Sequence, residues 1–327
     1  MVYLGVDGGG TKSAFMLIDQ IGEVLAYDIK GGSNYLQIGK ELIKDVLTEG
    51  ILAVSKQAGI NIKEIDFAFL GIPCYGEDRD GDQLIEETVA GILLGDNYLI
   101  GNDVEAGWAG SLACQPGINI VAGTGSIGYG KDQQGKSERC GGWGCFLGDE
   151  GSAYWLGKKL INLFTKEADG RLEKTPIYQI IRDKYELQSD FDFISLVYDK
   201  LECKRENIAG MAPLLTQAAR EGDKFAVNIF DEAAKELSML VKSIIKSLDF
   251  RAGQAIPVSY SGGVFKAVEL ILNPLNKYLS YENVKLIKPI MQPVTGAALN
   301  AIKLSGNLSD YKEIVARLKE EEKSIIK

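Results

Sequence analysis

A run of three glycines near the N-terminus has the composition of a phosphate-binding loop. The loop consists of Asp7, Gly8, Gly9, Gly10, Thr11 and Lys12. Short apolar runs on both sides predict strands, so the loop is expected to close a β-hairpin whose backbone N–H groups form a concave anion site. A P-loop or dinucleotide fingerprint would need a helix directly after the glycines, and the spacing fits neither motif. The alternative is a tight turn that uses glycine only for backbone freedom.

The same pattern of strand, glycine loop, strand, polar turn and strand returns later in the chain. The second loop contains Gly123, Thr124, Gly125 and Ser126. Such self-similarity indicates an internal duplication, and two hairpins of this kind are expected to bind the phosphates of one nucleotide from two sides. A third glycine turn, at Gly262 and Gly263, follows a predicted strand and precedes a predicted helix over residues 264–279.

Two aspartates lie at the ends of predicted strands, where open α/β sheets bind ligands. Asp7 is beside the first glycine loop, and we expect it to organise Mg²⁺ through water, because Mg²⁺ keeps most of its waters. The alternative for Asp7 is a turn residue that bonds its own backbone. Asp103 is the candidate general base, which would accept a hydroxyl proton during phosphoryl transfer. The alternative for Asp103 is the N-cap of the following helix.

The segment from Cys140 to Ser152 is rich in glycine and contains a tryptophan, a combination suited to binding a sugar. Gly142, Trp143 and Gly144 offer backbone groups and an aromatic surface, and Asp149 can accept hydrogen bonds from hydroxyls or cap the next helix. Cys140 and Cys145 have no second cysteine pair and no histidine nearby, so a metal site is not expected there.

Composition excludes several classes of function. A chain of 327 residues with 46% hydrophobic and 25% charged residues is expected to form two domains of a globular protein. The net charge of −9 argues against nucleic-acid binding. Five scattered cysteines and no apolar stretch of membrane-spanning length predict a cytoplasmic protein without membrane association. Because the chain has no histidine, acid–base chemistry must use carboxylates.

Periodicity predicts a mixed α/β chain with a helical section in its second half. The expected strands cover residues 2–7, 12–18, 23–29, 66–72, 98–101, 119–122, 127–130, a segment ending at 140, 256–260 and 284–287. The expected helices cover residues 40–58, 82–93, 150–166, 176–185, 191–201, 213–220, 225–248, 264–279, 294–304 and a segment beginning at 310.

These motifs in this order resemble the BadF/BadG/BcrA/BcrD ATPase family, and specifically its N-acetylglucosamine kinase-like members. The matching segments are VDGGGTKS, GGSNYL, GNDVEAG, VAGTGSIG, CGGWGCFLGDEGSAYWLG, YSGGVF and TGAAL. The resemblance implies a duplicated actin-like, hexokinase-like (ribonuclease H-like) α/β fold with ATP and sugar in the cleft between two lobes. We expect an N-terminal lobe over 1–115 and a C-terminal lobe over 116–327, whose last helix can pack back on the first lobe.

The resemblance also implies ATP and Mg²⁺ as cofactors and phosphorylation of the 6-hydroxyl of an N-acetylated amino sugar. Carried over by position, Asp103 is the base and Thr11 and Thr124 belong to the phosphate hairpins. Ala209 and Gly263 line the adenosine. The residues that match sugar contacts are Asn34, Ser126, Gly142, Trp143, Gly144 and Asp149.

The sugar itself stays open at this point. Ile72-Pro73-Cys74 replaces a Ser-Gly-Gly of animal members, so N-acetylglucosamine, N-acetylmuramic acid and glucosamine are all candidate substrates. A different class within the same broad family is the ATP-hydrolysing activator of a 2-hydroxyacyl-CoA dehydratase, in which cysteines bridge an iron–sulfur cluster between subunits. Cys114 is the one candidate for that role. Relatives also suggest a homodimer.

Overall fold

The chain folds into two compact units, each built on its own five-stranded sheet. The computed structural model describes residues 1–326, except the side chain of Lys40. The first unit comprises Met1–Pro116 and the chain from Lys288 onward, and the second comprises Gly117–Ile287. Each unit encloses a separate hydrophobic core.

The sheet of the first unit has the strand order β3-β2-β1-β4-β5. Its strands are β1 (Val2–Asp7), β2 (Lys12–Asp19), β3 (Val24–Gly31), β4 (Phe67–Ile72) and β5 (Tyr98–Asn102). The first three strands form an antiparallel meander, and β4 and β5 continue from β1 in parallel. The glycine loop therefore closes a β-hairpin, as the apolar runs around it predict.

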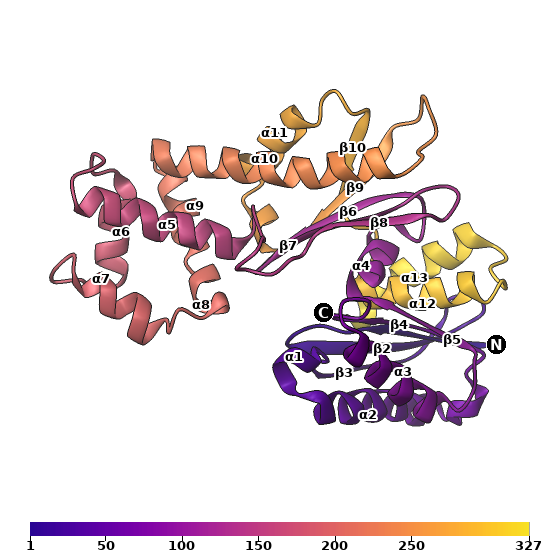
Figure 1. Cartoon of the computed structure of the whole chain (residues 1–327). Helices are drawn as coiled ribbons and strands as arrows, with labels where there is room; N and C mark the ends of the chain where they lie inside the picture. The colour runs from indigo at the N-terminus through magenta and orange to yellow at the C-terminus, as the bar shows by residue number, and fades with distance from the viewer. Residues whose placement is uncertain (327) are drawn as a thin grey trace. The chain divides into compact units, whose positions relative to one another are not determined.

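Helices cover both faces of this sheet (Figure 1). They are α1 (Tyr35–Ile38), α2 (Lys40–Ala58), the 3₁₀ turn η1 (Ile62–Glu64), α3 (Arg79–Leu93), α4 (Asp103–Leu112), α12 (Pro293–Leu304) and α13 (Tyr311–Ile325). Phe15 of β2 packs against Gly50 of α2 in the core, whereas Gly5 of β1 faces α12 on the opposite side. A Cβ at Gly5 would lie 2.2 Å from the Ala298 nitrogen, so glycine is what allows α12 to pack directly on the strand.

The sheet of the second unit repeats this topology. Its order is β10-β9-β6-β7-β8, with an antiparallel meander of β6 (Gly117–Ala122), β7 (Ser126–Lys131) and β8 (Ser137–Gly141). The strands β9 (Ile256–Ser261) and β10 (Val284–Ile287) continue from β6 in parallel, as β4 and β5 do from β1. The predicted duplication is therefore confirmed, and the fold is α/β.

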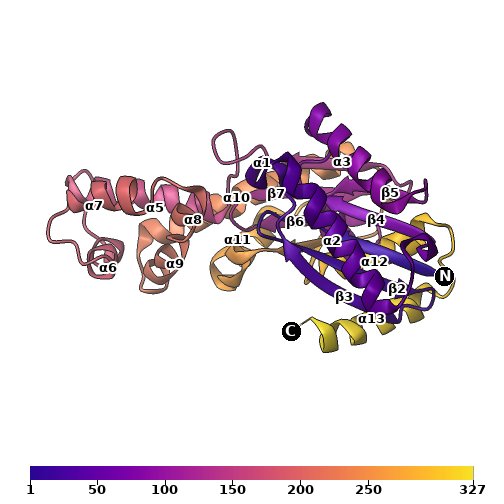
Figure 2. The ribbon, with the colours of Figure 1, turned by 90° about the horizontal axis from the view of Figure 1, so that it is seen from below.

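The second unit differs from the first by a group of helices beside its sheet (Figure 2). Its helical elements are α5 (Ala153–Ala168), α6 (Pro176–Lys184), α7 (Asp192–Ser195), the π-helical η2 (Leu196–Lys200), α8 (Arg205–Ala209), α9 (Ala212–Arg220), α10 (Lys224–Ser247), the 3₁₀ turn η3 (Gly263–Lys266) and α11 (Val268–Tyr278). The long α10 packs on the sheet, where Ile244 lies over Gly128 and Gly130 of β7.

Two features differ from the expectations. The segment from Lys288 onward belongs to the first unit by its contacts, rather than the C-terminal lobe, because α12 packs on β1 and α4. The helix expected over 264–279 is interrupted, since η3 ends at Lys266 and Ala267 has a ψ of 57° before α11 begins.

Candidate functional site

The carboxyl ends of three parallel strands meet at one edge of the first sheet. Asp7 at the end of β1 pairs with Gly71 of β4, and Ile72 at the end of β4 pairs with Asn102 of β5. Asp103 begins α4 directly after β5, so this register brings the two predicted aspartates to the same edge. Gly71 lies beneath Asp103, where a Cβ would come within 3.4 Å of the Asp103 Cα.

The two aspartates are close enough to affect each other's charge. Burial raises the pKa of Asp7, the carboxylate of Asp103 raises it further and Lys12 lowers it, with a net value of about 7. A second negative charge at this edge is therefore unfavourable without a cation or a proton. Mg²⁺ prefers carboxylate, phosphate and water oxygens, so the donor set fits that ion.

Asn102, and not Asp103, caps α4. The side chain of Asn102 accepts a hydrogen bond from the Val104 N–H at 3.3 Å and donates one to the Tyr75 carbonyl at 3.0 Å. The N-cap position, which was the alternative role for Asp103, is therefore filled by Asn102. Asp103 lies in the first turn of α4, where the helix dipole favours an ionised carboxylate.

The first glycine hairpin packs tightly against the segment that follows β3. The Ser33 N–H donates to the Gly9 carbonyl at 2.9 Å, and a Cβ at Gly8 would lie 2.4 Å from the Ser33 hydroxyl oxygen. Gly8, Gly9 and Gly10 all have ordinary negative φ angles, so close approach rather than backbone strain requires glycine at Gly8. The hairpin also carries the exposed Thr11 and Lys12.

Asn34 lies beside this hairpin and caps the short helix α1. Its side-chain oxygen accepts hydrogen bonds from the Leu36 N–H at 3.1 Å and from the Cys74 thiol at 3.7 Å. The structure thus brings Asn34 and the first hairpin together. Cys74, from the unusual Ile72-Pro73-Cys74 segment, contacts Asn34, which is one of the residues expected to bind the sugar.

The second hairpin is held by the start of α5. The carbonyls of Gly123 and Thr124 accept hydrogen bonds from the Ala153 and Tyr154 N–H groups at 2.8 and 3.3 Å. Gly262 lies against the same hairpin, with a φ of +106° and with the Ala122 carbonyl 2.4 Å from where its Cβ would be. The second hairpin and the third glycine turn therefore form one cluster.

Asp149 lies behind the second hairpin and is 2% exposed. Its Oδ1 accepts a hydrogen bond from the Ser126 N–H at 3.1 Å, and its Oδ2 accepts one from the Arg205 Nη2 at 2.5 Å. Ser152 caps α5 by accepting from the Trp155 N–H, so the capping alternative for Asp149 does not hold. Asp149 instead joins the hairpin to α8.

The predicted sugar-binding loop continues from Ser126. The Gly142 N–H donates to the Ser126 carbonyl at 3.0 Å, and the Gly148 N–H donates to the Gly144 carbonyl at 2.9 Å. Between them Trp143 is 74% exposed. Little packing holds this ring, so its aromatic surface is accessible to a ligand.

A cavity of about 410 Å³ lies in the second unit, between the helices and η3. It brings together Ala209 and Gly263, the two residues expected to line the adenosine. Small or apolar residues form most of the remaining lining, with Thr216, Arg220 and Lys266 as polar groups. Its size and its mostly apolar lining suit a nucleoside.

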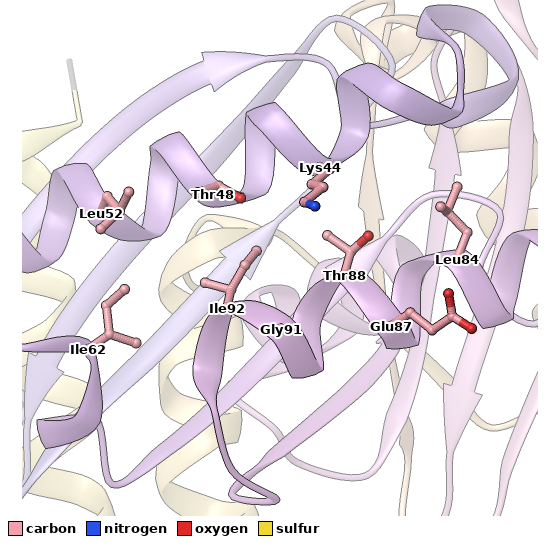
Figure 3. Close-up of a pocket in the computed structure, with 9 residues that line it drawn as sticks. All are labelled: Lys44, Thr48, Leu52, Ile62, Leu84, Glu87, Thr88, Gly91 and Ile92. Atoms are coloured by element: carbon pink, nitrogen blue, oxygen red, sulfur yellow. The ribbon is translucent and has the colours of Figure 1, made fainter.

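A second cavity of about 490 Å³ lies in the first unit between α2 and α3 (Figure 3). Leu52, Ile62, Leu84 and Ile92 supply its apolar lining. It contains none of the predicted site residues.

Sequence reasoning missed Arg205 and the residues beside Ala209 and Gly263 in the first cavity. Arg205 lies in the charged stretch Lys204-Arg205-Glu206, which reads as an ordinary exposed helix start. No sequence signal connects it with Asp149, 56 residues away.

Within residues 1–326, no group of three or more Cys, Asp or Glu side chains is placed to bind a metal ion. Cys114 is fully buried against the carbonyls of Ala109 and Gly296 in the first unit.

Among the helices described, none combines the length and apolar character needed to cross a membrane.

Two sheets of matching topology, each with a glycine hairpin, define the duplicated actin-like fold that sugar kinases and related ATPases share. The structure of a putative N-acetylglucosamine kinase from Chromobacterium violaceum aligns with a TM-score of 0.69 at 26% identity, covering 92% of this chain and 98% of that one. A ROK hexokinase from Thermus thermophilus aligns with a TM-score of 0.60 at 20% identity, covering 94% and 100%, and shows the fold alone.

The chain belongs to the BadF/BadG/BcrA/BcrD ATPase family, which it matches over residues 4–301. It is 32% identical to N-acetyl-D-glucosamine kinase of Dictyostelium discoideum, over 92% of this chain and 98% of that protein. It is 33% identical to N-acetylmuramic acid/N-acetylglucosamine kinase of Clostridium acetobutylicum, over 91% and 97%. The chain is thus an enzyme, an ATP-dependent sugar kinase with a small-molecule substrate.

Proposed function

We propose that this kinase transfers the γ-phosphoryl group of ATP to the 6-hydroxyl of an N-acetylated amino sugar, either N-acetylglucosamine or N-acetylmuramic acid. The observation that carries the mechanism is the carboxyl edge of the first sheet, where Asp103 lies beside Asp7 and Asn102 does the capping. The choice of sugar is supported by the relatives from Dictyostelium discoideum and Clostridium acetobutylicum.

Asp103 is the proposed general base. Its carboxylate accepts the proton of the sugar hydroxyl as that oxygen attacks the γ-phosphorus, and ADP leaves with the β–γ bridging oxygen. A base in this role needs no histidine, which agrees with the composition of the chain. The start of α4 favours the ionised form that the reaction requires.

The phosphates are proposed to bind to the two glycine hairpins. Gly8, Gly9 and Gly10 with Thr11 and Lys12 form one, and Thr124 with Gly125 forms the other. Backbone N–H groups in each loop are the donors, and Lys12 adds a positive charge. Asp7 is the residue proposed to hold Mg²⁺, through water; the ion would supply neutralisation of the phosphate charge.

The nucleoside is proposed to occupy the cavity lined by Ala209 and Gly263, with Gly262 leading from the cavity to the second hairpin. The amino sugar is proposed to contact Asn34 and, in the second unit, Ser126, Asp149 and the loop of Gly142, Trp143 and Gly144. The exposed Trp143 ring offers a flat apolar surface to the sugar. Asp149 is 2% exposed in this structure, so the proposed hydrogen bonds from sugar hydroxyls to its carboxylate require the surrounding loop to move when the sugar binds.

The dehydratase-activator alternative finds no support in the position of its cysteine. A cluster shared between two subunits would need accessible cysteines, whereas Cys114 is fully buried. We further propose a homodimer that acts in the cytoplasm.

Product analysis tests the position of transfer. After incubation with ATP and N-acetylglucosamine, ³¹P NMR is expected to show a phosphomonoester whose phosphorus couples to the two C6 protons. The 6-deoxy sugar serves as the control and should yield no product. Phosphate at C1, or a product from the 6-deoxy sugar, would contradict the proposal.

A further inference from the structure

We propose that Arg205 is a positioning residue that couples the nucleotide cavity to sugar binding at Asp149. The proposal rests on the proposed function, because it takes the cavity as the nucleoside site and Asp149 as a sugar contact. All of its parts lie in the second unit. It adds a residue to which the sequence motifs assign no role.

The ion pair of Arg205 and Asp149 fixes the orientation of a buried carboxylate. Asp149 is 2% exposed and Arg205 keeps about a third of its side chain in solvent, with 2.5 Å between Nη2 and Oδ2. A buried charge that loses its partner is strongly unfavourable, so Asp149 depends on Arg205. The other oxygen, Oδ1, is held by the Ser126 N–H, which leaves the carboxylate little freedom.

The guanidinium also lies directly against the second phosphate hairpin. A Cβ at Gly125 would lie 2.1 Å from the Arg205 Nη2 and 2.7 Å from the Asp149 Oδ1, so glycine is required for this contact. The Arg205 Nε is buried and has no hydrogen-bond partner in the described part of the chain.

A single short helix carries Arg205 at its start and the cavity wall at its end. The helix α8 runs from Arg205 to Ala209, and Ala209 and Gly210 line the proposed nucleoside cavity. Ile208 packs so closely on α5 that a Cβ at Gly157 would lie 2.1 Å from the Ile208 carbonyl oxygen. A ligand that shifts or orders the wall of the cavity therefore acts on the guanidinium only a few residues away.

This arrangement predicts that nucleotide and sugar strengthen each other's binding. Nucleotide in the cavity fixes α8, α8 fixes Arg205, and Arg205 holds Asp149 in the orientation that accepts sugar hydroxyls. By linkage, the factor by which nucleotide tightens sugar equals the factor by which sugar tightens nucleotide. Arg205 is expected to contribute to this factor and much less to nucleotide binding alone.

Calorimetry on the full chain tests the coupling. The Kd of N-acetylglucosamine is measured with and without a saturating non-hydrolysable ATP analogue, for the wild type, Arg205→Gln and Arg205→Lys. The matched control is Arg171→Gln, which removes an exposed arginine that also pairs with an aspartate in this unit. The wild type and the control are expected to show tightening of about 5- to 150-fold.

Arg205→Gln should reduce that tightening to about twofold or less, and Arg205→Lys should retain part of it, because lysine keeps the charge but not the planar fork. The analogue's Kd without sugar should change little in either variant. If Arg205→Gln unfolds, Arg205→Lys carries the test, with thermal melting confirming its fold. The coupling is overturned if the ATP analogue lowers the sugar Kd of the folded Arg205 variants as much as that of the wild type. It is also overturned if the wild type binds the sugar but the analogue does not lower its Kd. A wild type that binds no amino sugar contradicts the proposed function instead.

Discussion

Burial and the neighbouring carboxylate of Asp103 raise the pKa of Asp7 to about 7, which identifies the two aspartates as one electrostatic unit. Because carboxylates with perturbed pKa values concentrate at functional sites, this pair supports the proposal that phosphoryl transfer takes place at the carboxyl edge of the first sheet. The N-cap of α4 is Asn102, so Asp103 does not fill that position.

Replacement of Asp103 by asparagine tests its role as base. The amide keeps the size and the position of the side chain but cannot accept the hydroxyl proton. We expect kcat to fall by about 10² to 10⁴-fold, the usual contribution of general base catalysis, with the sugar KM changed much less. Steady-state kinetics measures both, and Asp96→Asn, outside the proposed site, is the control. Near-normal turnover would remove Asp103 from this role.

A pair of adjacent glycines tests the packing behind the second hairpin. A Cβ at Gly262 would lie 2.4 Å from the Ala122 carbonyl oxygen, and the φ of +106° is unfavourable for alanine. Gly262→Ala is therefore expected to lower the free energy of unfolding by about 1–3 kcal/mol or more. A Cβ at Gly263 would meet open space, so Gly263→Ala is the matched control. Urea unfolding measures both, and equal stabilities would contradict the close approach.

Part of the site could be predicted from the sequence and part could not. Alternating apolar residues around Gly8–Gly10 and Gly123–Gly125 locate both hairpins, since strand periodicity is a local property. Asp103 could be chosen as a candidate because it comes directly after a predicted strand. The packing of α12 on Gly5 and the reach of Arg205 to Asp149 depend on contacts between distant residues, and neither leaves a local pattern.

A buried pair of carboxylates in the second unit predicts a pH-dependent stability. The Thr175 hydroxyl lies 2.6 Å from the Glu167 Oε1 and 2.5 Å from the Asp223 Oδ2, yet it has one proton to donate. A proton on Glu167 satisfies both contacts, by donation to the Thr175 oxygen. Burial raises the pKa of Glu167, with the charges of Asp223 and Glu173 adding to it and the hydrogen bonds from Thr175 opposing it.

A raised pKa in the folded state contributes stability that is complete below the unfolded value of 4.5 and is lost as pH rises through the folded value. Glu167→Gln keeps a donor to Thr175 and does not ionise. The melting temperature of Glu167→Gln minus that of the wild type is therefore expected to increase as pH rises from 4 to 9, by on the order of a few degrees. The exposed Glu202→Gln serves as the control. A constant difference between Glu167→Gln and the wild type across that pH range would place the proton elsewhere.

Sugar-stimulated release of ADP shows whether this chain phosphorylates an amino sugar. A coupled ADP assay with purified protein, ATP and Mg²⁺ would compare N-acetylglucosamine, N-acetylmuramic acid, glucosamine, N-acetylmannosamine and glucose. We expect strong stimulation by N-acetylglucosamine or N-acetylmuramic acid. Stimulation mainly by glucosamine would correct the proposed substrate, and ADP release that none of these sugars stimulates would contradict phosphorylation of an amino sugar.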